Sequence, residues 1–249
     1  MKKIILVAAL IAGFTSAQAQ EGVRLGVKGS YFSTWLFNKN VSDQDASLDY
    51  ASTFSAAFGA QAVFMFAETY GMSAEIISAS HKQKYDGLIG NSDDLAFTNE
   101  IKLSYIDIPV MFRVSSPKGP YFELGPQFCL LTGAKETFSL ENDLLDLSYS
   151  DKDVKNDFNG FGVAGVLGFG IDIKLSEMIN LTTGLRFGYM FSDATTEYTK
   201  SELEDLGEKA SMVSAYSHYT ADSPSKFDYK ASNRVFGGLQ LGLQFQLGQ

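Results

Sequence analysis

One stretch near the C-terminus, residues 233–247, constrains the fold more than any other part of the sequence. From position 235 onward its odd-numbered residues are apolar apart from Gly237, whereas its even-numbered residues include Gln240, Gln244 and Gln246. A period of two predicts a β-strand with one apolar and one polar face. Strands of soluble proteins usually have about five or six residues, but a tilted strand that crosses a bilayer needs about 9 to 11. The stretch therefore predicts the closing strand of a transmembrane β-barrel.

The N-terminus has the three parts of an export signal. Lys2 and Lys3 precede an apolar run over residues 4–14, and the small-residue sequence Ala-Gln-Ala follows at 17–19. This run is shorter than the roughly 20 apolar residues of a membrane helix, and no other run approaches that length. We therefore expect residues 1–19 to be a signal peptide and residues 20–249 to form one domain. Without a membrane helix, only a closed barrel could carry the chain across a bilayer.

Seven further segments alternate in the same way, which predicts an all-β fold of eight antiparallel strands. The connections between them alternate in length: four are long (38–53, 84–98, 136–158 and 193–232) and three are short (67–71, 115–119 and 175–178). This rhythm is typical of outer-membrane barrels, which have short periplasmic turns and long extracellular loops. Part of the last loop, residues 200–213, could form a short amphipathic helix. The seven segments are residues 23–32, 55–66, 72–83, 99–114, 120–134, 161–174 and 179–191.

The segment 99–114 contains an apparent change of phase. Its apolar positions are odd up to Tyr105 and even from Ile106 onward. A slip of one residue is what a β-bulge produces, and Pro109, which lacks an N–H group, needs an irregular or unpaired position. We therefore expect a bulge in this strand.

Alternation alone does not tell which face points into the barrel, so a secreted soluble barrel around a small ligand is an alternative. The polar face is mostly Gly, Ser, Gln and Thr with few charges, which suits a confined interior better than a solvated surface. The opposite face carries bulky Phe, Leu, Ile and Val side chains on every strand. They are too many to fit in one small lumen, so we expect them to contact lipid. Because a buried charge without a partner is costly, the near balance of charges also favours a packed interior. The charged residues expected to form this luminal network are Arg24, Lys28, Glu75, Asp107, Arg113, Glu123, Asp172, Lys174 and Arg186.

Two neighbouring segments resemble a known family. Residues 105–111 read YIDIPVM and residues 119–127 read GPYFELGPQ, and this pair resembles the PorT-like "porin family" of outer-membrane β-barrel proteins. The resemblance implies an eight-stranded barrel similar to small OmpA-type and OmpX-type proteins, with no catalytic residues. The interior of an eight-stranded barrel is only wide enough for side chains, so a general diffusion pore does not follow.

Residues with catalytic or metal-binding chemistry are few. His81 and His218 are the only histidines, and a surface hydrolase would have to use one of them with loop acids. Residues 151–157 faintly resemble a calcium loop, but Lys155 occupies the fifth position and no glycine occupies the sixth. Loose binding of divalent cations by the acidic loops is an alternative to a merely solvated surface. We therefore predict no catalytic, cofactor or metal site. Cys129 is the single cysteine of the sequence, so no internal disulfide can form, and we expect it to be a packing residue.

The expected function follows from the expected location in the outer membrane. The first hypothesis is a non-enzymatic, monomeric barrel whose loops support envelope integrity or contact an extracellular or envelope protein. The second is a narrow gated conduit for solutes or ions, and the third is a surface enzyme. The expected partners are outer-membrane lipid and an unidentified protein, and the net charge of -9 argues against nucleic acid.

Overall fold

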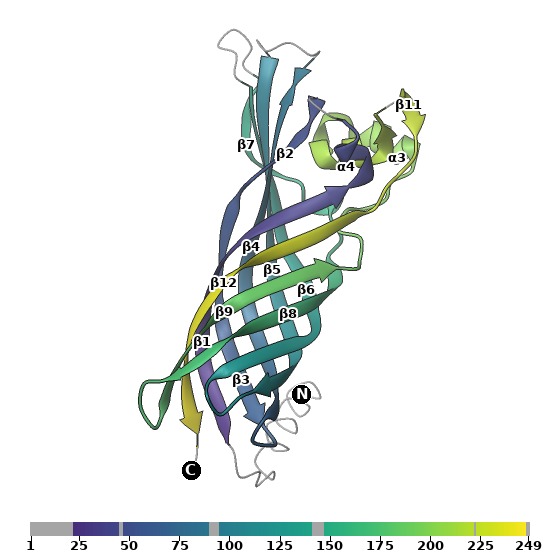
Figure 1. The fold of residues 1–249 in the computed structure, drawn as a ribbon. Helices are drawn as coiled ribbons and strands as arrows, with labels where there is room; N and C mark the ends of the chain where they lie inside the picture. The colour runs from purple at the N-terminus through teal and green to yellow at the C-terminus, as the bar shows by residue number, and fades with distance from the viewer. Residues whose placement is uncertain (1–21, 45–46, 90–94, 141–146, 222, 248–249) are drawn as a thin grey trace, which may run out of the picture.

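The computed structural model describes residues 22–44, 47–89, 95–140, 147–221 and 223–247, and the predicted signal peptide lies outside them. Eight long antiparallel strands form a closed barrel (Figure 1). Each strand pairs with its neighbour in the chain, and the last pairs with the first. All eight predicted strands are therefore confirmed. Their bounds are β1 (Val23–Asn38), β3 (Phe54–Met65), β4 (Tyr70–Leu88), β5 (Ala96–Ser115), β6 (Pro120–Leu140), β8 (Phe161–Lys174), β9 (Ile179–Met190) and β12 (Ser232–Leu247).

The pairing of β1 with β12 closes the barrel. Its register is unbroken from Val23↔Leu247 at one end to Asn38↔Ser232 at the other. The start of β1 and the end of β12 therefore lie at the same end of the barrel, and the short turns lie at that end too. The long loops lie at the opposite end (Figure 1), which is the arrangement predicted for periplasmic turns and extracellular loops.

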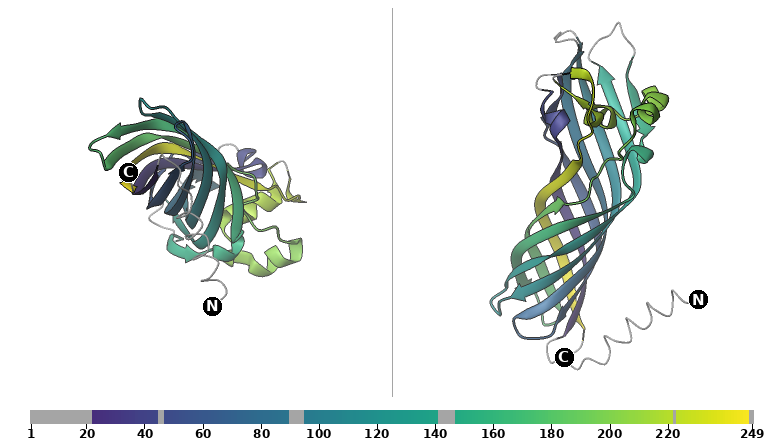
Figure 2. Two further views of the ribbon diagram at one scale, coloured as in Figure 1. Left: turned by 90° about the horizontal axis from the view of Figure 1, so that it is seen from below. Right: turned by 90° about the vertical axis from the view of Figure 1, so that its right-hand side faces the viewer.

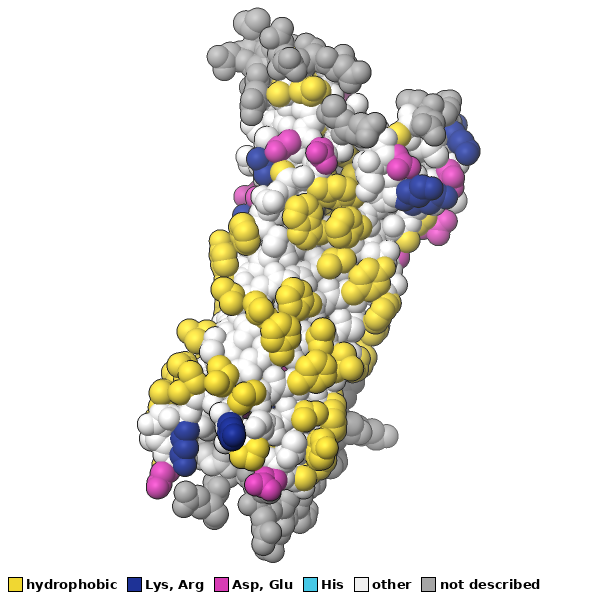
Figure 3. Space-filling model, viewed as in Figure 1, with side chains coloured by type: hydrophobic (Ala, Val, Ile, Leu, Met, Phe, Trp, Pro, Cys, Tyr) yellow, Lys and Arg dark blue, Asp and Glu magenta, His cyan; other side chains and the backbone are white. Residues whose placement is uncertain are grey.

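The apolar register points outward. On β12, the side chains of Leu239 and Leu241 are 62% and 57% exposed, whereas those of Gln240 and Gln244 are buried. Hydrophobic side chains cover the barrel wall, and charged ones gather toward its two ends (Figure 3). The alternative of a soluble barrel with an apolar interior is therefore wrong, because water would face a continuous wall of Leu, Phe and Ile.

The predicted bulge in β5 is wrong. Burial alternates without interruption along β5, so Tyr105 points inward and Ile106 points outward. The apparent slip arises because the interior itself changes from polar to apolar along the strand. The register shift lies instead in β6, where Ser104 of β5 pairs with Gly133 and Tyr105 with Leu131.

Three strands continue well beyond the rest of the barrel. β4, β5 and β6 extend at the loop end, and two short strands pair with their outer edges (Figures 1 and 2). These are β2 (Asp49–Ala51) on β4 and β7 (Tyr149–Asp153) on β6. The sequence analysis assigned this extension to loops, because its outward residues are mostly polar or charged and only its inward residues, such as Tyr85 and Phe97, are buried.

Short helices form a cap at the loop end, and two of them contribute Val41 and Val213 to the same core as Tyr85 and Phe97 of the extension. The helices are α2 (Lys39–Ser42), α3 (Lys200–Leu206) and α4 (Met212–His218). The expected helix over residues 200–213 is broken at Gly207, whose positive φ of 49° ends α3. A β-hairpin of β10 (Tyr219–Thr220) and β11 (Ser223–Phe227) completes the cap. Among the described residues, no helix has the length and apolar character needed to span a membrane.

Candidate functional site

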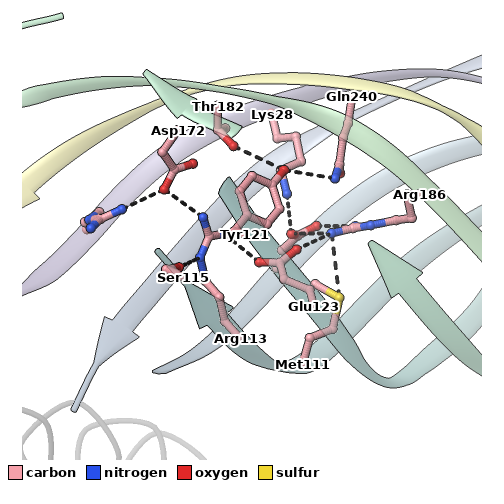
Figure 4. A network of polar contacts seen from close by, with 12 residues as sticks. Lys28, Met111, Arg113, Ser115, Tyr121, Glu123, Asp172, Thr182, Arg186 and Gln240 are labelled. Atoms are coloured by element: carbon pink, nitrogen blue, oxygen red, sulfur yellow. Dashed lines mark hydrogen bonds and ion pairs between the residues drawn. The ribbon is translucent and has the colours of Figure 1, made fainter. Parts of the chain in front are cut away.

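The lower half of the barrel interior is filled by a network of charged side chains, drawn in Figure 4. At its centre, the Arg186 guanidinium donates to both oxygens of Glu75, at 2.6 and 2.8 Å. The Lys28 ammonium donates to the same carboxylate at 2.6 Å. The Glu123 carboxylate lies 3.4 Å from Arg186 on its other side. Because all four residues are buried, each charge depends on its neighbours for compensation.

The network continues toward the periplasmic end through Arg113. Its guanidinium donates to Glu123 at 2.7 Å and to Asp172 at 2.7 Å, and it lies 3.9 Å above the ring centre of Tyr121. Arg24 donates to the same Oδ2 atom of Asp172 at 2.8 Å. Seven charged side chains therefore form one continuous network, which we call the basal network.

The basal network contains seven of the nine residues expected from the sequence. The structure places Lys174 outside it, because its side chain lies exposed at the periplasmic end of β8. The alternation along β8 assigned Lys174 to the face that points into the barrel. At this last residue, however, β8 extends beyond the closed part of the barrel, so the side chain is exposed. Asp107 faces the interior but belongs to a second cluster, nearer the loop end.

This second cluster consists of His81, Asp107, Thr34 and Arg234. The Asp107 carboxylate accepts a hydrogen bond from His81 Nε2 at 3.0 Å, which leaves His81 Nδ1 to accept from the Thr34 hydroxyl at 3.0 Å. The guanidinium of Arg234 lies 3.7 Å from Asp107 and 4.1 Å above the ring centre of Tyr105.

The sequence analysis missed the roles of two of these residues. His81 was considered only as part of a surface hydrolase with loop acids, but it lies inside the barrel with 2% exposure. Arg234 was not assigned to a face, although it is fully buried. The even positions of β12 carry the buried glutamines, so extending that alternation back to 234 would have identified this arginine.

Residues of both clusters, His81 and Asp107 of the second and Arg186 of the basal network, line a cavity of about 30 Å³. This volume has room for one or two water molecules. Above the second cluster, an apolar layer fills the upper barrel. Its buried side chains are Leu36, Ile101, Leu103, Leu131, Ala164 and Met190.

Two buried carboxylates attach the cap to the barrel. Glu136 accepts hydrogen bonds from the backbone N–H of Met212 at 2.8 Å and from Tyr149 OH at 2.8 Å. Asp157 accepts from the backbone N–H of Ser211. Both contacts hold the start of α4, whose Val213 is buried in the same core as the apolar layer.

His218 holds the other end of α4. Its Nδ1 donates to the carbonyl of Ser214 at 2.6 Å, so Nε2 accepts from the backbone N–H of Tyr198 at 2.8 Å. The ring packs 4.5 Å from the ring centre of Tyr229. Burial lowers the pKa of His218, although its hydrogen bond to Ser214 and the nearby carboxylates oppose this. The neutral ring is therefore the form that fits this position.

Within the described part of the chain, no three His, Cys, Asp or Glu side chains are grouped so that they could hold a metal ion. Part of the acidic third loop, residues 141–146, lies outside that part. The described interior side chains thus form a polar core below an apolar one.

A closed eight-stranded wall with a lipid-facing apolar exterior and a filled polar core defines a transmembrane β-barrel of the outer-membrane kind. Residues 16–196 match the family described as "Outer membrane protein beta-barrel domain". The chain belongs to this family, and it is an outer-membrane protein. Comparison with curated protein sequences gives no match.

Several solved structures are similar to the chain. Ail, the attachment invasion locus protein of Yersinia pestis, has 10% identity and a TM-score of 0.37, covering 91% of this chain and 99% of Ail. Neisserial surface protein A has 9% identity and a TM-score of 0.39, covering 91% and 98%. The outer-membrane protease OmpT of Escherichia coli has 8% identity and a TM-score of 0.36, covering 91% and 97%.

Proposed function

We propose that this protein is a non-enzymatic membrane anchor, in which the barrel presents a folded extracellular platform to an outside or envelope partner. The platform comprises the extension of β4–β6 with β2 and β7, and the cap of α2, α3, α4 and the β10–β11 hairpin. The observation that carries the proposal is the attachment of this cap. Buried Glu136 and Asp157 hold α4, and Val213 enters the barrel core. A surface held in one conformation can bind a partner without first paying the entropy of ordering.

The filled interior supports an anchor over a conduit. A permeating solute would have to displace the basal network, in which Arg186 alone makes two short hydrogen bonds to Glu75. It would then have to cross the apolar layer above the cavity of about 30 Å³. Both steps would leave buried charges or apolar contacts uncompensated.

The environment of the histidines argues against a hydrolase. Thr34, His81 and Asp107 are linked in the order of a hydroxyl, a base and an acid, as in nucleophilic catalysis. However, His81 and Thr34 are 2% and 3% exposed, and the adjoining cavity has no room for a substrate. His218 has no exposed surface, and both of its ring nitrogens are engaged by backbone groups.

We further propose the narrower relationship to the PorT-like proteins. The two segments that carry this resemblance lie side by side in β5 and β6, where Pro109 pairs with Gln127. Their inward residues, among them Asp107 and Glu123, supply acids to both interior clusters. The resemblance therefore concerns the residues that fill the lumen.

A variant that we call cap-less, in which a short Gly-Ser linker replaces residues 196–228 and only α2 of the cap remains, tests the proposed function. Heat-modifiable migration on a gel first establishes that its barrel is folded. The full chain is expected to give no steady single-channel steps in a planar bilayer and to restore detergent resistance to cells that lack the gene. The cap-less variant is expected not to restore it. Steady conductance of the full chain, or full restoration by the cap-less variant, would contradict the proposal.

A further inference from the structure

Three lysines stand side by side on the outer face of the barrel wall. In the strand register, Lys82 of β4 pairs with Lys102 of β5, and Lys102 pairs with Lys135 of β6. All three alternate with buried neighbours, so they point away from the interior. Adjacent strands are about 4.8 Å apart, which brings the three ammonium groups within reach of one small anion. We call these residues the lysine row.

The rows below it become steadily less polar. The next outward-facing residues toward the periplasm are Ser80, Ser104 and Thr132. The third row contains Ser78 of β4, Ile106 of β5 and Leu130 of β6, so two of its three residues are aliphatic. The sequence of lysine, hydroxyl and aliphatic rows follows the polarity change from lipid headgroups to hydrocarbon tails.

The height of the row also fits the edge of a bilayer. Aromatic residues gather near the periplasmic end, where the rings of Phe66 and Tyr70 lie 6.5 and 6.0 Å from that of Phe112. Lys102 precedes Phe112 by ten residues in β5 and therefore lies nearer the loop end. At about 3.3 Å per residue and a tilt of about 40°, this spans about 25 Å, the usual height of the apolar band. The lysine row therefore lies at the headgroup level of the outer leaflet.

The described acidic residues around the lysine row neutralise its two outer lysines but leave the positive charge of Lys102, at its centre, without a partner. Lys82 pairs with Glu100 at 2.9 Å, and Lys135 pairs with Asp151 at 3.3 Å. Lys102 is exposed and has no acidic partner among the described residues. Like charges directly opposite one another on adjacent strands are destabilising.

The other charged groups nearby do not supply an anion for Lys102. Lys84 pairs with Asp86 at 3.1 Å. Asp153 lies opposite Lys135 on β7 and accepts a hydrogen bond from the backbone N–H of Lys155. In the row below Lys102, the hydroxyl of Ser80 has no hydrogen-bond partner among the described residues.

We propose that the lysine row binds the phosphate of an outer-leaflet lipid headgroup, with Lys102 as the central contact. A phosphate carries the negative charge and the acceptor oxygens that the row needs. A lipid is the fitting source because the aliphatic side chains below the hydroxyl row, such as Ile106 and Leu130, would contact its acyl chains. Bound lipid would relieve the repulsion within the row and fix the extended strands at the membrane surface.

Native mass spectrometry of the detergent-solubilised full chain tests this proposal, with bis-phosphorylated lipid A as the probe. Lys102→Ser is expected to weaken binding about fivefold, the effect of one basic residue at an anionic surface. Lys102→Ser combined with Lys135→Ser is expected to weaken it further. The matched control is Lys209→Ser, which removes an exposed lysine from the cap, above the membrane, and is expected to change nothing. Heat-modifiable migration confirms that each variant is folded.

Two further probes identify the ligand chemistry. Lipid A without its phosphates is expected to bind the parent protein as weakly as the phosphorylated lipid binds the double variant. Inorganic phosphate at millimolar concentration is expected to compete poorly, because it lacks acyl chains. Equal binding by the parent and Lys102→Ser, an equal loss with Lys209→Ser, or complete displacement by inorganic phosphate would overturn the proposal.

Discussion

At the scale of single residues, the interior depends on a few carboxylates that each serve several cations. Glu75 is the clearest case, because it accepts from Lys28 once and from Arg186 twice. It lies on β4, while its partners come from β1 and β9. One side chain thus links strands on different sides of the barrel.

Replacing Glu75 by Gln is expected to lower the free energy of unfolding by about 3 to 5 kcal/mol, because it leaves two buried cations without their shared anion. Urea unfolding of the protein in lipid vesicles measures this. The matched control is Glu204→Gln, which breaks the exposed pair of Lys200 with Glu204 and is expected to cost less than about 1 kcal/mol. A double variant with Lys28→Met is expected to recover part of the loss. Equal costs at positions 75 and 204 would show that the network is not structurally important.

On the outer face, Leu241→Arg places a charge at the middle of the lipid-facing surface of β12. It is expected to cost about 2 to 4 kcal/mol, because lipid cannot solvate the guanidinium. Leu247→Arg makes the same change on the same face at the periplasmic end of the strand, where the expected cost is about 0 to 1 kcal/mol. Urea unfolding in vesicles compares the two, and a cost that does not depend on position would contradict the placement of the bilayer.

At the scale of elements, alternation predicted all eight barrel strands because each has one face in lipid and one in the core. It failed where that contrast disappears. In β5 the inward residues Leu103 and Tyr105 are apolar, so a straight strand resembled a bulged one. Beyond the bilayer, the outward residues of β4 to β6 are mostly polar or charged, so the sequence no longer distinguished a strand from a loop.

The cap was not predictable from local sequence. Its helices are short, and they are held by contacts between distant residues, such as Glu136 with the start of α4. For the interior clusters, face assignment identified most of the charged residues. It did not reveal which of them touch, because partners such as Arg186 and Glu75 lie across the lumen on non-adjacent strands.

The cap is expected to loosen in acid because of His218. Its pKa in the closed cap lies below the ordinary value of about 6.5, so an open cap binds a proton more readily. The stabilisation is complete above the ordinary pKa and is lost as the pH falls through the lowered one. Glu197, Asp157 and Asp193 act in the opposite direction and limit the shift.

Hydrogen exchange measures this loosening. After correction for intrinsic rates, the amide of Tyr198 is expected to exchange faster at pH 5 than at pH 7.5, because protonated Nε2 cannot accept its hydrogen bond. In His218→Phe, exchange at this amide is expected to be fast at both pH values, and the amides of β8 serve as an internal control. Protection of Tyr198 that does not change with pH in the parent protein would contradict this role.

At the scale of the whole molecule, successive layers of side chains fill the barrel from one end to the other. The basal network fills its lower half, a small cavity separates this network from the His81 cluster, and the apolar layer joins the barrel to the cap. Lipid contacts the outer wall. The account as a whole depends on which face of the strands meets the hydrocarbon.

Spin-label accessibility along β12 tests this most directly. Single nitroxide labels at positions 239 to 244 of the protein in vesicles report contact with oxygen, which concentrates in lipid, or with a water-soluble nickel chelate. Labels at 239, 241 and 243 are expected to be accessible to oxygen, and labels at 240, 242 and 244 to be shielded from both reagents. Oxygen accessibility at the even positions, with shielding at the odd ones, would contradict the account.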